Sequence, residues 1–281
     1  MSGRRPPRLA AACLALLAVP PFSLAQAKPA EAKAVDAKAA AGKVVDGKVA
    51  DGVAVPFPSA ETLTYNIEWR LIYAGAARVT LEPAASTDGQ KWHTSLHVES
   101  GGMVSKLYKL EDTYNVDMVN QFCAVSTHLD SREGKRHKET VVDFDHNRGK
   151  AIYTERDLVR NATIKTAEVA IPACASDVIG GLLKLRTMHL EPGQSAQIPL
   201  SDGKKSAMAR IEAQDREQIK VTAGTYNTVR YEAFLFNGVL YARKAELYVW
   251  LTDDARRLPV QIRARMNFPI GSITFTLDKA D

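Results

Sequence analysis

The stretch Leu63-Thr64-Tyr65-Asn66-Ile67-Glu68-Trp69 shows the pattern that decides the fold. Apolar side chains alternate with polar ones, and the alternation continues through Leu71 to Tyr73. A period of two residues is typical of a strand with one face buried. The sequence therefore predicts a half-buried strand here, followed by a second strand after a break at Ala74-Gly75.

The same alternation returns along the rest of the chain. It covers residues 77–81, 92–99, 246–251, 260–267 and 273–277. Turn-forming residues stand between the runs, at Asp88-Gly89, Asn147-Arg148-Gly149, Asp202-Gly203 and Asn237-Gly238. Many strands joined by short turns indicate an antiparallel sheet.

One segment has helical spacing instead. After Pro172, Ser176 is placed to cap a helix over Asp177 to His189, whose apolar residues recur every three or four positions before Pro192-Gly193 ends it. The expected fold is mainly β: a large curled antiparallel sheet or half-barrel, with one amphipathic helix over one opening. The interior of such a sheet either fills with side chains or holds a ligand.

The first residues predict export. Arg4, Arg5 and Arg8 precede a short apolar run that ends at Ala25-Gln26-Ala27, so residues 1–27 have the anatomy of a cleaved signal peptide. The run is too short for a transmembrane anchor, which needs about 20 apolar residues. Lipid anchoring through Cys13 fits poorly, because Cys13 precedes most of the apolar run. We expect a periplasmic protein.

Composition divides the remainder into a tether and a domain. Residues 28–54 are rich in Ala, Lys, Val, Asp and Gly and have no aromatic residue, so a disordered tether is expected there. Residues 55–281 are long enough for a single β-rich domain. Removing residues 1–27 takes away three arginines and no acidic residue, so the net charge falls from +5 to +2. Acidic and basic residues are interleaved in what remains, which argues against nucleic acid as a partner.

Two cysteines, Cys123 and Cys174, remain after signal cleavage. An oxidising compartment allows them to form a disulfide, and two separate buried thiols are the alternative. Both interpretations stay open, because a sequence does not show whether two Cα atoms lie close enough to be bridged.

The sequence contains no familiar catalytic, nucleotide-binding or metal-binding motif, so neither an enzyme nor a bound cofactor or metal is expected. His93 and His97 would approach each other on a helix, but on a strand their Cα atoms lie about 13 Å apart. The acidic run Asp143-Phe144-Asp145-His146 lacks the spacing of a calcium loop and is typical of a solvated hairpin end.

The aromatic residues give the candidate ligand site. Trp69, Tyr73 and Trp250 fall on predicted strands, and Leu107 and Tyr108 lie in an apolar segment that follows a Gly-Gly pair. Together they could line an apolar cavity under a mobile flap. The alternative is that they belong to an ordinary core and a wide hairpin.

Several segments in order resemble an exported bacterial family, domain of unknown function 3108 (DUF3108). They are Leu63 to Trp69, Ser105 to Lys109, the helix opening at Asp177, Ala223 to Thr228 and, above all, Leu247 to Val260. The resemblance covers about Glu61 to Leu277. It implies a mainly antiparallel domain in the Gram-negative envelope, similar to the half-barrels of periplasmic lipoprotein carriers, and it brings no activity and no functional residues.

The best functional interpretation is a non-enzymatic carrier or binding module for a lipid or another apolar envelope molecule. The alternative is a structural or assembly factor that binds an envelope protein partner through a sheet edge or the flap. An enzyme with an unfamiliar site is the third interpretation.

The signal peptide gives a first prediction. N-terminal sequencing of protein recovered from the envelope fraction is expected to start at or near Lys28, because Ala25-Gln26-Ala27 is the best processing site. Envelope material that still begins at Met1 would contradict it.

Overall fold

The computed structural model describes residues 60–84, 91–267 and 270–281. The predicted signal peptide, the predicted tether and the turn at Asp88-Gly89 lie outside the described residues. Within these residues the chain forms fourteen strands and two helices.

The elements follow one another with short connections. The first half comprises β1 (Glu61–Trp69), β2 (Ile72–Ala84), β3 (Lys91–Ser100), α1 (Gly102–Leu107), β4 (Leu110–Val119), β5 (Cys123–Glu133), β6 (Arg136–Asp145), β7 (Lys150–Asp157) and β8 (Ala162–Ala170). The second half comprises α2 (Val178–Thr187), β9 (Ser195–Ser201), β10 (Ser206–Val221), β11 (Gly224–Ala233), β12 (Ala245–Thr252), β13 (Pro259–Met266) and β14 (Ser272–Ala280).

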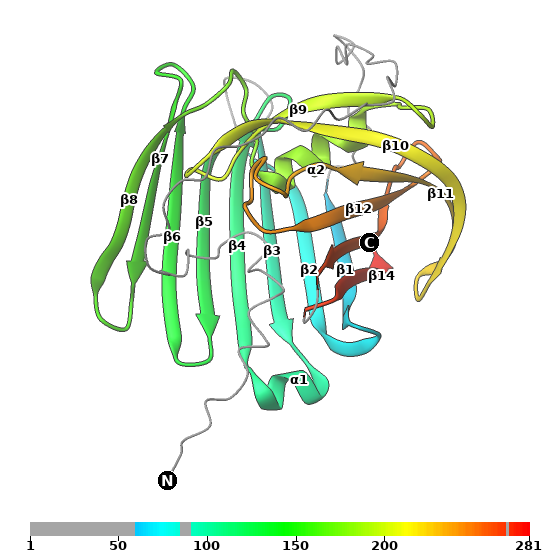
Figure 1. Ribbon diagram of the computed structural model, residues 1–281, viewed down its shortest axis with the longest axis horizontal. Coiled ribbons are helices and arrows are strands. Elements are labelled where there is room, and N and C mark those ends of the chain that lie inside the picture. The colour runs from blue at the N-terminus through cyan, green and yellow to red at the C-terminus, as the bar shows by residue number, and fades with distance from the viewer. Residues whose placement is uncertain (1–59, 85–90, 268–269) are drawn as a thin grey trace, which may run out of the picture.

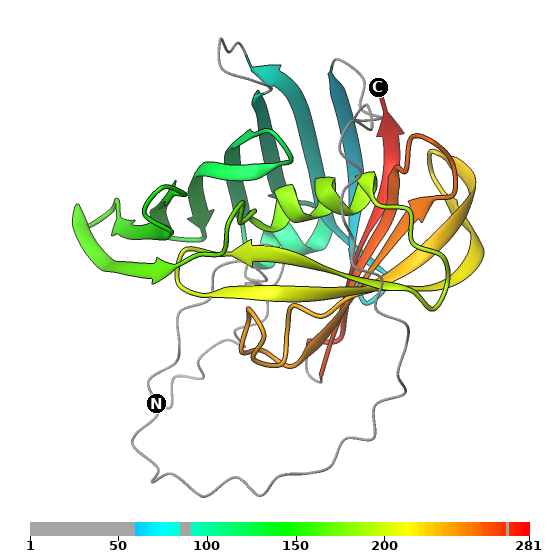
Figure 2. The same ribbon diagram turned by 90° about the horizontal axis from the view of Figure 1, so that it is seen from above.

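All fourteen strands belong to one antiparallel sheet, which confirms the predicted fold class. The order is β8-β7-β6-β5-β4-β3-β2-β1-β14-β13-β12-β11-β10-β9, so nearly every strand pairs with its neighbour in sequence. The first and last strands, β1 and β14, pair in the middle of the sheet, and β8 and β9 form its edges (Figure 1). The sheet curls around α2, which lies within its hollow (Figure 2).

The predicted first strand is shorter than the alternation indicated. It ends at Trp69, and Arg70 and Leu71 form a hairpin turn with φ of 50° and 71°. Tyr73 therefore belongs to β2, which runs without a break past Gly75. At Gly75 the β1–β2 register shifts, and a Cβ there would lie 2.0 Å from the Glu99 carbonyl oxygen, so only glycine fits.

The predicted helix forms with a different cap. Asp177, and not Ser176, is the N-cap residue, and its carboxylate accepts hydrogen bonds from the backbone N–H groups of Ile179 (2.9 Å) and Gly180 (2.8 Å). The Ser176 hydroxyl instead donates to the Phe122 carbonyl at 2.6 Å. A second, six-residue helix, α1, occupies the segment for which a flap was predicted.

The segment before α2, residues 171–176, bridges two distant parts of the sheet, and we call it the strap. On one side the Ala175 carbonyl accepts a hydrogen bond from Ala124 N–H of β5 at 3.0 Å. On the other side Ser176 bonds through both its N–H and its carbonyl to β9, at Pro199 and Ser201. The strap therefore joins β5 to the β9 edge and closes the hollow around α2 on that side.

A disulfide between Cys123 and Cys174 ties the strap to β5. Lys184 of α2 reaches the same place, because its ammonium group donates to the Cys174 carbonyl at 2.8 Å. Burial lowers the pKa of Lys184 to about 8. The strap, the start of β5 and α2 are thus fastened together at one point.

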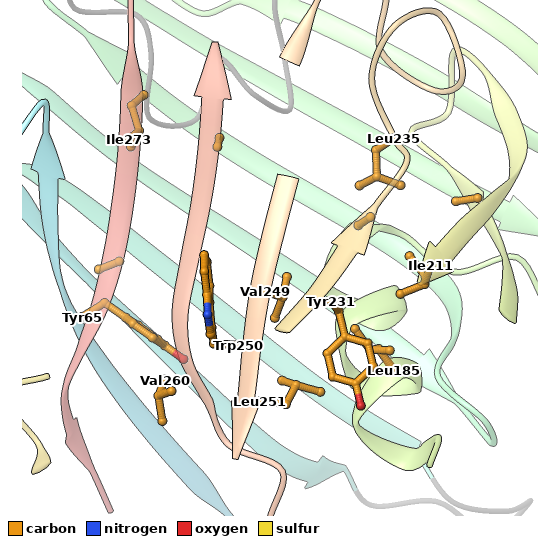
Figure 3. Packing of buried hydrophobic residues seen from close by; sticks show 14 of the residues in the cluster. Tyr65, Leu185, Ile211, Tyr231, Leu235, Val249, Trp250, Leu251, Val260 and Ile273 are labelled. Atoms are coloured by element: carbon orange, nitrogen blue, oxygen red, sulfur yellow. The ribbon is translucent and has the colours of Figure 1, made fainter. Parts of the chain in front are cut away.

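The main core includes residues of α2 and of the concave sheet face, and Figure 3 shows part of it. Leu185 of α2 and Val249 of β12 belong to it, and so does Tyr65 of β1, whose hydroxyl donates to the Pro259 carbonyl at 2.8 Å. A smaller cluster packs the strap against β5, β6 and β7. The strand faces that point inward are therefore apolar over both parts of the sheet.

One ion pair is buried within this core. Arg186, near the end of α2, donates to both carboxylate oxygens of Glu61 on β1, at 2.6 and 3.0 Å, and both side chains are 2% exposed. The same guanidinium also donates to the carbonyls of Arg256 and Arg257 in the β12–β13 turn. These bonds hold the end of α2 against two separate parts of the sheet.

Replacing one partner of this pair is expected to be costly. The Arg186→Met variant should lose about 3 to 5 kcal/mol in the free energy of unfolding, measured in urea, because it leaves the Glu61 carboxylate buried without its charge partner. The double variant Glu61→Leu, Arg186→Met is the control, and it should recover a large part of the loss because no charge is left unpaired. The account would be contradicted if the double variant lost at least as much free energy of unfolding as the sum of the losses in Arg186→Met and Glu61→Leu.

Candidate ligand cavity

A cavity of about 190 Å³ lies between α2 and the concave face of the sheet. Strands β1, β2 and β3 contribute one wall, and α2 and strands from the second half of the sheet contribute the others. Its apolar lining includes Leu63, Ala77, Val79, Leu96, Leu182, Leu235, Leu247, Ile262 and Phe275.

The lining follows from strand alternation. Val79 pairs with Leu63 on one side and Leu96 on the other, so all three side chains point to the same face of the sheet. Val79, Leu247, Ile262 and other lining residues are only partly buried although they face inward. These side chains face the cavity because α2 is too short to cover them all.

The size of the cavity limits what it can hold. An engineered apolar cavity of about 150 Å³ in another protein stays dry and binds benzene. At about 190 Å³, this cavity has the size to take a small ring system or a short alkyl chain.

Few polar atoms reach the cavity. Glu61 and Arg186 line one end, where they are paired with each other. Thr94 also lines the cavity, and the residue is 1% exposed. Its hydroxyl has no hydrogen-bond partner within the part of the chain that the structure describes. This hydroxyl is a polar group placed toward the cavity interior.

A smaller chamber of about 40 Å³ lies next to the main cavity, at the N-terminal end of α2. Val178 and Tyr241 line both spaces. The side chamber has a mixed lining and is more polar than the main cavity. Leu129, Val142, Phe144 and Val178 contribute apolar surface, and the polar residues are Tyr114, Thr127, Thr140, Tyr153, Asp177, Ser201, Asp202, Lys204 and Tyr241.

The side chamber holds a buried carboxylate and a buried phenol. Burial raises the pKa of Asp177 above its ordinary value, and the N–H donors of Gly180 and Ile179 act in the opposite direction. Tyr114 also donates to this carboxylate, at 3.2 Å. The hydroxyl of Tyr241 is buried without a hydrogen-bond partner in the described residues. The chamber can therefore offer hydrogen bonds to a small polar group.

Two of the five residues proposed from the sequence lie at the β1–β2 hairpin, and neither belongs to the cavity lining. Trp69, at the end of β1, donates its indole N–H to the Ile270 carbonyl at 2.7 Å. Tyr73 is 47% exposed and its ring packs against Gly101 and Gly102. Both lie here because the strand turns at Arg70 and Leu71.

Leu107 and Tyr108 are also absent from the lining. Leu107, the last residue of α1, is 82% exposed. Tyr108 donates its hydroxyl to Glu133 at 3.0 Å. The predicted flap is therefore not the cover of this cavity.

Trp250 is buried but points away from the cavity. Its indole donates to the Glu217 carboxylate at 2.8 Å, and the Arg263 guanidinium lies 5.4 Å from its ring centre. Trp250 faces away because side chains alternate along β12. Val249 lines the cavity, so the next residue faces the opposite side of the sheet. The residues that line this cavity could have been predicted by following the alternation of the apolar strand residues instead of the aromatic residues.

With this geometry established, comparison with known proteins gives the family. The model of the family "protein of unknown function (DUF3108)" matches residues 64–278, which is most of the chain. This chain belongs to the DUF3108 family. A search of curated proteins finds no match to its sequence.

Solved structures share the architecture of this DUF3108 domain. A β-barrel-like protein of domain of unknown function DUF1849 from Brucella abortus superposes with a TM-score of 0.51 at 10% identity, covering 79% of this chain and 97% of that chain. At this identity the likeness supports the fold alone.

Two looser likenesses were also found. A protein from Parabacteroides distasonis described as a lipoprotein gives a TM-score of 0.32 at 8% identity, covering 82% and 100% of the two chains. A protein from Bacteroides fragilis described as exported, with a YmcC-like fold, gives 0.29 at 8% identity, covering 79% and 95%. Among the described residues, no helix is long and apolar enough to cross a bilayer.

The cavity hydroxyl gives a prediction for the free protein. Thr94→Val keeps the shape of the side chain and removes an unpartnered hydroxyl, so the free energy of unfolding should rise by about 1 kcal/mol. Thr228→Val is the matched control, because Thr228 is equally buried but donates to the Glu217 carbonyl at 2.7 Å. That variant should lose about 1 to 3 kcal/mol. Equal losses in both variants would show that the Thr94 hydroxyl has a partner.

Proposed function

We propose that this DUF3108 protein is a non-enzymatic periplasmic carrier or binding module for a single-chain lipid or another apolar envelope molecule. The observation that carries the proposal is the cavity of about 190 Å³ between α2 and the concave sheet face. A folded protein normally packs its interior to near crystal density, so a space of this size inside an apolar core is a candidate ligand site.

The shape of the two spaces favours an amphiphile. The main cavity offers apolar contacts along its length, whereas the side chamber beyond Val178 and Tyr241 offers hydroxyl groups and a carboxylate. A single acyl chain of about eight carbons would occupy the first and direct a small polar end group toward the second. Ligands with several acyl chains exceed the available volume.

Two features support the periplasm as the compartment. Residues 1–27 read as a signal peptide, and a disulfide between Cys123 and Cys174 suits an oxidising compartment. The periplasm satisfies both, and an apolar molecule must be shielded from water to cross it.

A protein-binding role is the second candidate, and the β8 edge favours it. Most residues of this nine-residue strand are exposed, and one side of it has no strand partner in the described sheet. An extended segment of an envelope protein could add to this edge by backbone pairing. Such a role would leave the cavity unused.

The test of the carrier proposal is calorimetric titration of the mature protein with unbranched fatty acids of increasing length. Each added methylene should strengthen binding by about 0.8 kcal/mol, about fourfold, until the cavity is full at about eight carbons. The fatty acids that just fill the cavity should bind in the micromolar range, with a binding free energy of about −6 to −8 kcal/mol.

A cavity-filling variant makes the test specific. Val79→Phe places extra carbon atoms in the cavity and should weaken fatty-acid binding at least about tenfold while the protein stays folded. Val125→Phe, the same substitution at a position that is 40% exposed on β5, should bind as the native protein does. If the well-folded native protein binds no fatty acid of any length, the carrier proposal fails and the β8 edge becomes the better account.

A further inference from the structure

Four connections of the first half of the sheet share one edge, which we call the turn edge. In an antiparallel meander every second connection lies on the same side, so the β1–β2, β3–β4, β5–β6 and β7–β8 connections come together there (Figure 1). Backbone hydrogen bonds join the first three, since Gly101 N–H donates to Ala74 and Gly134 N–H donates to Lys109. The turn edge is therefore a built surface and not a set of separate loops.

The exposed apolar side chains of the protein gather on this edge. Of the nine large apolar residues exposed among the described residues, six lie here, and they include the four most exposed: Leu71 (90%), Leu107 (82%), Met103 (74%) and Val159 (65%). Ile72 and Tyr73, about half exposed, complete the group. A concentration of this kind is typical of an interaction site.

Leu71 is also unexpected on conformational grounds. It has φ of 71° in a two-residue hairpin turn, a position that asparagine or glycine occupies at lower cost. Its side chain gains no burial in return, because it is 90% exposed. Neither turn formation nor solubility explains a leucine at this position, which favours a contact with something other than the described residues.

The connections that form the turn edge carry basic side chains. The connections at residues 70–71, 101–109, 134–135 and 158–161 contain five basic residues, Arg70, Lys106, Lys109, Lys135 and Arg160, and no acidic residue. All five are exposed. Acidic residues at the adjoining strand ends offset part of this charge. Glu111 of β4 pairs with Lys109, Asp157 of β7 pairs with Arg160, and Glu133 ends β5.

We propose that the turn edge docks this protein on an anionic lipid membrane, with Leu71, Met103 and Leu107 inserted among the lipids. Apolar side chains that project from separate turns, with basic side chains between them, match the boundary between acyl chains and anionic headgroups. A protein partner would have to match four separate turns at once. The proposal does not depend on the cavity or its ligand.

Co-sedimentation of the mature protein with vesicles tests the proposal. The protein should bind vesicles of phosphatidylcholine mixed with phosphatidylglycerol, bind pure phosphatidylcholine vesicles at least about tenfold more weakly, and dissociate in high salt. The double variant Leu71→Asp, Leu107→Asp should lose at least about tenfold in affinity. The control Val125→Asp, Met208→Asp adds the same charge at exposed positions elsewhere and should lose much less.

A second experiment measures a gained signal instead of a loss of vesicle affinity. In Leu71→Trp the new indole should shift its fluorescence to shorter wavelength when anionic vesicles are added, whereas the indole of Met208→Trp should not. Absence of vesicle binding by the native protein, or an equal loss in both aspartate variants, overturns the proposal and leaves a protein partner for this edge. Neither Leu71→Asp nor Leu107→Asp touches the cavity lining, so fatty-acid binding should persist in both.

Discussion

One helix of ten residues has to cover the concave apolar face of a fourteen-stranded sheet, and the rest of the structure depends on how that is done. The buried bonds from Arg186 to Glu61 and to the β12–β13 turn fix one end of α2, while the Asp177 cap and the strap fix the other. A helix held at both ends cannot move to fill the space beside it. The cavity is what remains between a fixed helix and a sheet too large for it.

The strap extends the same constraint to the edges of the sheet. Ser176 pairs with β9, Ala175 pairs with β5, and the Cys123–Cys174 disulfide secures the junction. The hollow is thus closed by six residues of chain instead of by direct pairing of edge strands. The β8 edge and the turn edge lie outside this closed hollow, and they are the two surfaces that we propose for larger partners.

The sequence predicted the sheet and the helix well, but it predicted the first hairpin and the cavity lining less well. Alternation located most strands, because burial on one face fixes the parity of every side chain. It overran the hairpin at Arg70-Leu71, because a basic residue and a leucine carry no turn signal. The five candidate site residues lie outside the lining of this cavity for a different reason. The candidate residues were chosen because they are aromatic, and the alternation of each strand was not used to decide which face they occupy. Trp250 therefore faces away from the cavity, whereas its neighbour Val249 lines it. Neither the buried ion pair nor the strap pairing leaves a periodic signal, so both needed the fold.

The central claim is that the space beside α2 exists to hold an apolar molecule. Native mass spectrometry of the protein purified without detergent from the envelope of its own host tests this most directly. The account predicts a population heavier than the mature chain by the mass of one single-chain amphiphile, which Val79→Phe abolishes and Val125→Phe retains. A single species at the mass of the bare chain, in both the native protein and the Val125→Phe control, would contradict it.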